Sequence, residues 1–293
     1  METLINLAYQ ASESIALLAL PALGLIVIFG MMGVINMAHG EMMMVGAYVT
    51  SFAYYAGVPS GIGIVLGGIA AALVGILLER LIVRRFYGQL LSSLVVTWGI
   101  SLIMSQGALL LFGPLIQSVP TPFGSFSYGD YSYSIYRLVM IAASLLLVLG
   151  VWALFRFTEF GVRARSTMEK PEMARALGVD TGRMYALTFG LGAGLAGIAG
   201  GLFALTSTIG PFYGANYTPQ AFITVVVGGG TEVISGLLAS AFTLGLVRTA
   251  FTNQYNILIG YFAMLVFALI VIRFLPTGIS DWLEKRRVTG MRR

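Results

Sequence analysis

Long apolar stretches, each ended by glycine, proline or charge, dominate this chain. At least six of them approach the length of roughly 20 residues that crosses the hydrocarbon core of a bilayer, and the clearest lie near 61–79, 93–112, 135–155 and 256–274. No stretch between them is long enough for a folded soluble domain. We therefore predict an all-α fold, a polytopic helical bundle of about eight transmembrane segments, forming a single domain over residues 1–293.

Composition agrees with the hydrophobic pattern. Of the 293 residues 58% are hydrophobic and 10% are charged, whereas about a quarter of the residues of a soluble domain are charged. Cysteine is absent, which excludes a disulfide framework and thiolate chemistry. The first residues, METLINLAYQASES, lack the basic segment and cleavage site of a secretory signal, so we expect the N-terminus to be mature.

The basic residues indicate the topology. Most of them fall into three groups, at 80–85, 156–183 and 273–293, and none precedes Arg80. The positive-inside rule places these groups in the cytoplasm, which puts the C-terminus inside and, by counting crossings, the N-terminus outside. The loop 114–134 has one acid and no base, so we expect it outside. The net charge of +5 sets topology and does not indicate nucleic-acid binding, because no aromatic platform accompanies it.

Two segments interrupt the apolar pattern, which predicts broken or re-entrant helices. The first is GVINMAHGEMMMVG at 33–46, and the second is the GGGTE at 228–232 within the apolar run 221–250. If the second segment dips into the membrane and returns, the C-terminus lies in the cytoplasm as the charges require. Non-helical backbone at membrane depth is tolerated only inside the protein or along a cavity, and paired interruptions are typical of transport sites.

The polar residues at these breaks are the candidate chemistry. A charge at the bilayer centre costs a few kcal/mol, so Glu41 and Glu232 must face a cavity, a partner or the interface. Asn36, His39 and Glu41 either border a pathway or only satisfy the backbone that the break frees. His39 is the sole histidine, and without a cluster of other ligands it makes a poor metal site, so we expect no metal.

Enzymatic function finds no support in the sequence. No nucleophile lies beside a base in a recognisable pattern, and the glycine-rich GGGTEVISG lacks the lysine of a phosphate-binding loop. The chain therefore needs an ion gradient or another subunit to drive active transport. Two further glycine-rich stretches, 61–75 and 189–204, have the small-residue spacing that lets membrane helices pack closely.

The cytoplasmic segment 161–184 contains a predicted short helix. Pro171 suits the first helical position and Gly178 the left-handed position after the end. Met173, Ala176 and Leu177 then share an apolar face. Such a helix lies on the membrane surface or fits a groove in a partner, and the residues alone do not decide between the two.

Several motifs together resemble one known family. These are GVINMAHGEMMMVGAY, LLERLIVRRFYGQLLSSLVVTWGISL, MEKPEMARALGVDTGRMYALTFGLGAGLAGIAG, AFITVVVGGG and LPTGI, in this order. They resemble the permease subunits of ATP-binding-cassette importers for branched-chain amino acids and urea, over about residues 20 to 280. The form of NMAHGE and of RRFYGQLLSSLVVTWGIS looks more like the urea branch.

The resemblance implies a multi-pass protein of the bacterial inner membrane that needs no cofactor of its own. It implies a second, related permease, two cytoplasmic ATPases and an extracytoplasmic binding protein as partners, and urea or a short amide as the solute. The alternatives are an importer of branched-chain or other hydrophobic amino acids, or an ion-coupled transporter or channel. The predicted pathway residues are Asn36, His39, Glu41, Thr97, Trp98, Thr231 and Glu232.

The same resemblance makes the short helix of 161–184 the coupling helix that docks on an ATPase. The residues assigned to this contact are Glu169, Glu172, Met173, Arg175, Ala176, Leu177 and Gly178.

Overall fold

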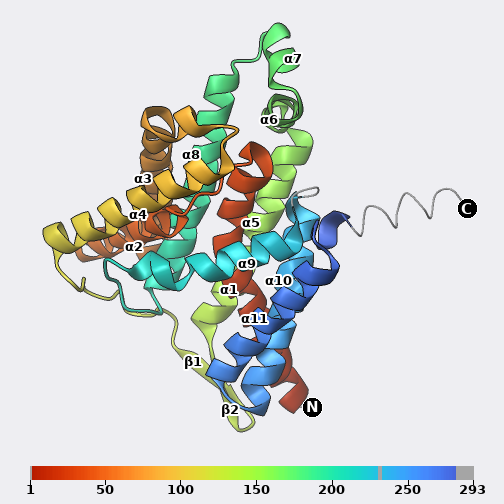
Figure 1. Ribbon diagram of the computed structural model, residues 1–293. Helices are drawn as coiled ribbons and strands as arrows, with labels where there is room; N and C mark the ends of the chain where they lie inside the picture. The colour runs from red at the N-terminus through yellow and green to blue at the C-terminus, as the bar shows by residue number, and fades with distance from the viewer. Residues whose placement is uncertain (1, 230–232, 282–293) are drawn as a thin grey trace, which may run out of the picture. The chain divides into compact units, whose positions relative to one another are not determined.

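The computed structural model describes residues 2–229 and 233–281, and almost all regular structure in them is helical (Figure 1). Seven of these helices are long and apolar enough to cross a membrane, and α9 is a shorter apolar helix. This confirms the prediction of a polytopic helical membrane protein. The helices are α1 (Glu2–Met32), α2 (His39–Tyr55), α3 (Ser60–Leu81), η1 (Val83–Phe86), α4 (Leu90–Phe112), α5 (Ile135–Phe157), α6 (Glu159–Glu169), α7 (Pro171–Ala176), α8 (Thr181–Ala204), η2 (Tyr213–Asn216), α9 (Thr218–Gly228), α10 (Val233–Gln254) and α11 (Ile257–Phe274).

A small hairpin lies in the loop that we placed outside the membrane. Strands β1 (Ser125–Tyr128) and β2 (Tyr131–Ser134) pair antiparallel, with Ser125 opposite Ser134. Gly129, at the turn, has a positive φ of 60°, which glycine adopts without a steric penalty. The sequence analysis placed this loop outside the membrane but did not predict the strands.

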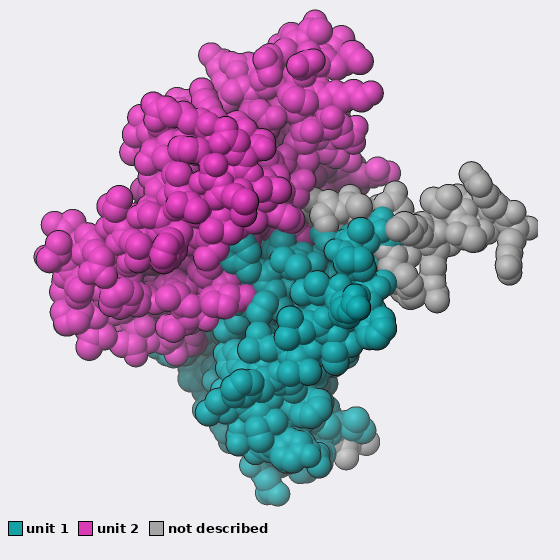
Figure 2. All heavy atoms as spheres, viewed as in Figure 1, with its two compact units in different colours: residues 1–22, 121–148, 220–293 teal, residues 23–120, 149–219 magenta. Residues whose placement is uncertain are grey.

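The chain folds into two compact units (Figure 2), each built from segments far apart in sequence. Unit 1 comprises residues 1–22, 121–148 and 220–293, and unit 2 comprises 23–120 and 149–219. Helices α1 and α5 contribute residues to both units. The single domain over 1–293 stays a prediction.

In unit 2, helices α2, α3 and α8 pack backbone against backbone. A Cβ atom on Gly46 of α2 would collide with the backbone of Gly197 in α8, and one on Gly197 would lie 2.8 Å from the carbonyl oxygen of Gly67 in α3. A Cβ on Gly200 would likewise collide with the backbone of Met43. The two glycine-rich stretches thus form the helix contacts that their spacing predicts.

In unit 1, the core is built from aliphatic side chains of α1, α9, α10 and α11. It contains Leu18, Ala19, Val227, Ala241, Leu244, Met264 and Ala268. Gly260 marks the close contact of α11 with α10, because a Cβ there would lie 2.8 Å from the carbonyl oxygen of Arg248.

The first interruption is narrower than predicted. Helix α1 continues to Met32, residues 33–38 form the linker, and α2 begins at His39. Gly33 opens the linker with a φ of 60°. His39, Gly40 and Glu41 are therefore the first turn of a helix and not the centre of a break, because the linker's turn chemistry lies upstream of them.

The second interruption separates two helices. α9 ends at Gly228, Gly229 has a φ of 82°, and α10 begins at Val233. The predicted pathway residues Thr231 and Glu232 lie outside the described residues.

We predict that Gly46→Ala destabilises the protein. The new methyl group forces α2 away from the α8 backbone, and overpacking of this kind costs about 1–3 kcal/mol. The measurement is the thermal melting temperature of the purified protein in detergent. Gly99→Ala is the matched control, since a Cβ at this α4 position meets nothing within 4 Å and alanine improves helix propensity. Equal melting temperatures for the two variants would contradict the packing argument.

Candidate functional site

The linker between α1 and α2 is held by one side chain of α4. The hydroxyl oxygen of Thr97 accepts a hydrogen bond from the backbone nitrogen of Met37 at 3.0 Å. It also lies 3.1 Å from the carbonyl oxygen of Ile35 and 2.8 Å from that of Ser93, and its single proton serves one of these at a time. Thr97 therefore satisfies backbone groups that the interruption removes from the helical ladder.

Asn36 shapes the same linker. Its side-chain oxygen accepts a hydrogen bond from the backbone nitrogen of Ala38 at 3.1 Å. Its backbone oxygen accepts a hydrogen bond from the backbone nitrogen of His39 at 3.2 Å. The side-chain nitrogen of Asn36 is buried and has no hydrogen-bond partner among the described residues. His39 is fully buried and packs on Gly24 of α1, where a Cβ would lie 3.0 Å from its Cε1 atom.

Glu41 lies in the first turn of α2 and is only 4% exposed. Its Oε1 atom accepts a hydrogen bond from the hydroxyl of Ser101 in α4 at 2.8 Å. Its Oε2 atom is buried without a partner among the described residues, as is the hydroxyl of Tyr48, two turns further along α2. Buried polar groups normally have partners, so this site holds unused hydrogen-bonding capacity.

The structure brings most of the described pathway candidates together, but not all. Thr97 and the linker residue Asn36 belong to one polar region with Glu41. Trp98, the neighbour of Thr97, is 55% exposed and faces away from it. Ser101 was missed by the sequence analysis, although it lies four residues after Thr97 and thus on the same face of α4.

This arrangement offers hydrogen-bonding groups to a small polar ligand. The described residues contain no group of three or more histidine, aspartate or glutamate side chains that could hold a metal. The free donor of Asn36 and the free acceptor of Glu41 are opposite in kind. A small solute with both an acceptor and a donor would match them.

The loop 161–184 contains the short helix that its sequence predicts. α7 begins at Pro171, and Gly178 follows its end with a φ of 83°. The backbone nitrogen of Val179 donates to the carbonyl oxygen of Ala174 at 3.0 Å, which closes the end of the helix. Met173 and Leu177 are 58% and 80% exposed, so the predicted apolar face is uncovered.

The segment after α3 lies against this loop through a buried acid. Glu79 of α3 is fully buried and accepts from the hydroxyl of Tyr87 at 2.5 Å and from Arg84 at 3.3 Å. Arg84 also donates to the carbonyl oxygen of Gly182 at 3.2 Å. Burial, together with the hydrogen bond to Glu79, raises the pKa of Tyr87, so its hydroxyl remains a donor.

From there the contacts continue into α6. The rings of Tyr87 and Tyr185 lie 4.8 Å apart, and the hydroxyl of Tyr185 is 3.4 Å from the carbonyl oxygen of Thr167. The position of the α6–α7 loop is thus fixed to α3 and α8 by side-chain contacts within unit 2.

Comparison with known proteins decides the family. Residues 7–274 match the family described as branched-chain amino acid transport system, permease component. The chain belongs to this family. It is a membrane-spanning transport permease, and members of this permease family are transport components, not enzymes.

Known relatives match nearly the full length of this chain. The high-affinity branched-chain amino acid transport system permease protein LivH of Escherichia coli K12 is 30% identical over 92% of this chain and 93% of its own. The corresponding protein BraD of Pseudomonas aeruginosa is 28% identical with the same coverage. The probable LivH of Methanocaldococcus jannaschii is 27% identical over 93% of this chain and 91% of its own. No solved structure matches the chain significantly.

These relatives bear on two predictions from the sequence, the family and the branch within it. The recognition of the branched-chain amino acid permease family is confirmed. The urea branch receives no support, and the amino acid alternative is better supported. The segments on which the urea branch rests, NMAHGE and RRFYGQLLSSLVVTWGIS, form the linker with the start of α2 and the stretch from η1 into α4.

We predict that Thr97→Val lowers the melting temperature of the permease. The replacement removes the acceptor for the backbone of Met37, and an unpaired buried donor costs about 1–3 kcal/mol. Thr97→Ser keeps the hydroxyl and should retain most of the stability. The comparison is made on purified protein by thermal unfolding; a valine variant as stable as the serine variant would show that Thr97 does not hold the linker.

Proposed function

We propose that this chain is the permease subunit of an ATP-driven importer that carries branched-chain or related hydrophobic amino acids across the bacterial inner membrane. A binding protein outside delivers the amino acid, and two cytoplasmic ATPases and a second permease complete the importer. The names of the relatives supply the solute class. The N-terminus lies outside and the C-terminus in the cytoplasm, as the distribution of basic residues predicts.

The observation that carries the ATP-driven reading is α7. It is a helix of 6 residues, too short to bind a membrane surface by an extended apolar face. It nevertheless exposes Met173 and Leu177 to solvent beside the charged Glu172 and Arg175. A short, capped helix with an uncovered apolar face suits a groove in a protein partner, and we assign the ATPase as that partner.

The pathway in this proposal passes the polar start of α2. Asn36 and Glu41 have buried polar atoms without partners among the described residues, and the carboxylate of Glu41 matches the ammonium donor of a transported amino acid. Thr97 and His39 support the linker, while Trp98 faces outward. Thr231 and Glu232 lie outside the described residues, and their place beside the pathway stays a prediction.

The rival function is ion-coupled transport or a channel, with Glu41 as the ion site. The carboxylate of Glu41 accepts a hydrogen bond from Ser101, and the described residues contain no group of three or more acids or histidines that could hold a metal ion. An ion-coupled carrier would also leave the uncovered face of α7 without a role. Both arguments favour the importer.

The test is uptake by proteoliposomes containing both permeases and the ATPases, with the binding protein added outside. We expect leucine, isoleucine or valine to accumulate only with internal ATP, and urea and acetamide not to accumulate. Uptake of leucine by the isolated permease along an ion gradient would support the rival. ATP-dependent uptake of urea, without that of amino acids, would restore the urea prediction.

The coupling assignment makes a separate prediction. Leu177→Ser removes the most exposed apolar side chain of the α7 face and should reduce uptake by about tenfold or more, equivalent to about 1.4 kcal/mol of coupling. The same reconstitution, with co-purification of the ATPase, measures it. Val162→Ser is the control, because Val162 is an exposed apolar residue of α6 in the same loop. Normal uptake and ATPase binding by the Leu177 variant would refute the docking of α7.

A further inference from the structure

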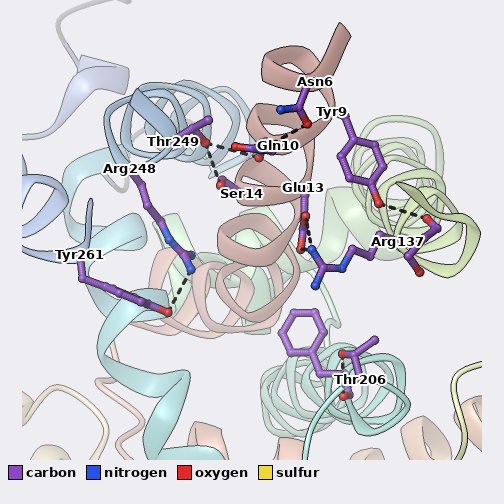
Figure 3. Close-up of polar contacts among 12 residues, drawn as sticks. Asn6, Tyr9, Gln10, Glu13, Ser14, Arg137, Thr206, Arg248, Thr249 and Tyr261 are labelled. Carbon is purple, nitrogen blue, oxygen red and sulfur yellow. Dashed lines mark hydrogen bonds and ion pairs between the residues drawn. The ribbon is translucent and has the colours of Figure 1, made fainter. Parts of the chain in front are cut away.

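Unit 1 contains a buried guanidinium that no acid among the described residues neutralises. Arg248 lies on α10 and is only 8% exposed. It lies six residues before the end of the helix at Gln254, about 9 Å along the axis at 1.5 Å per residue. Within the described residues of unit 1, the ion pair found is Glu13 with Arg137, at 2.8 Å. Figure 3 shows this pair, and shows Arg248 directed to Tyr261.

The contacts of Arg248 orient it without cancelling its charge. Its Nη2 atom donates to the hydroxyl of Tyr261 at 3.0 Å, and its Cζ atom lies 4.3 Å from the centre of that ring. The same hydroxyl accepts from the side-chain nitrogen of Gln220 at 3.3 Å. A guanidinium has five N–H donors, so one hydroxyl and one ring leave most of its capacity for anions unused.

A second donor lies on the same face of α10. Thr252, one helical turn after Arg248, has a buried hydroxyl without a partner among the described residues. Gly260 brings the α11 backbone close to both positions. An intramembrane charge is costly and typically marks a functional position. Here the charge and the unpaired hydroxyl occur together.

We propose that Arg248 and Thr252 bind the carboxylate group of the transported amino acid. The planar guanidinium matches a carboxylate with two parallel hydrogen bonds, and the Thr252 hydroxyl can donate a third. This inference rests on the proposed function, since it assigns a binding group for the same solute. Access to the buried guanidinium requires α11 to move from α10, a change of the kind that alternating access supplies.

Two other occupants fit the observations less well. A lipid phosphate or an acid of the second permease would have to reach Arg248 from the surface of the protein, and Arg248 is only 8% exposed. A small solute carboxylate is compact enough to enter between two helices.

The first measurement is leucine transported per ATP hydrolysed by the complete importer, with saturating loaded binding protein. Arg248→Gln should lower this ratio by about tenfold or more, because it removes the charge that pairs with the carboxylate of leucine. ATP hydrolysis itself should continue. Arg248→Lys should recover part of the ratio, and Thr252→Val should reduce it by less than Arg248→Gln. Arg273→Gln, which removes the same charge from an exposed position on α11, should stay within about twofold of wild type, a difference under about 0.4 kcal/mol.

The second measurement tests the carboxylate directly. The melting temperature of the importer without binding protein should rise with high concentrations of leucine and N-acetylleucine, which keep the carboxylate, and not with leucinamide, which lacks it. Arg248→Gln should abolish the rise. Equal stabilisation by leucinamide, or none by any of the three compounds in wild type, overturns the inference.

The outcomes separate this inference from the proposed function. If wild type imports no branched-chain amino acid, the proposed function fails. If wild type imports leucine and Arg248→Gln does so with an unchanged ratio, only the carboxylate site fails. If Arg248→Gln loses the second permease on purification while Thr252→Val has a normal ratio, Arg248 pairs with the partner chain and the proposal is overturned.

Discussion

Unit 2 depends on glycines at the contacts between α2, α3 and α8, where there is no room for a side chain. In a bilayer, apolar side chains gain nothing by leaving lipid for another helix, so association relies on close packing. Gly46, Gly67 and Gly197 let backbones meet at distances that a single methyl group would prevent. This close packing fixes the start of α2 and leaves the faces of α3 and α4 free to carry exposed apolar residues.

The polar groups of unit 2 follow from the same constraint. Ending α1 at Met32 and starting α2 at His39 leaves backbone groups without helical partners, and at membrane depth such groups need partners within the protein. Thr97 and Asn36 satisfy part of this demand. The carboxylate of Glu41 satisfies none of these backbone groups. One of its oxygens has no partner among the described residues, so helix packing alone does not explain why an acid lies here.

Much of the fold was predictable because lipid imposes simple rules on sequence. The length of apolar runs predicted the spans, and Pro171 with Gly178 predicted both ends of α7. The strands at 125–134 were not predictable, since their short alternation is weak beside a tyrosine-rich loop. Among the site residues, the sequence identified Asn36, Thr97 and Glu41 by their polarity. Ser101 and Arg248 become informative only through tertiary contacts. Serine is common in helices, and Arg248 lies outside the three basic groups used for topology.

The exposed face of α7 has a consequence for the life of the chain in the cell. In the assembled importer Met173 and Leu177 would be covered by another subunit, but a newly inserted permease displays them to water on a rigid, capped turn. Uncovered apolar surface of this kind attracts chaperones and proteases. If α7 docks on the ATPase as we propose, its apolar face would therefore also mark any copy of the permease without an ATPase, and so keep the subunits in balanced amounts.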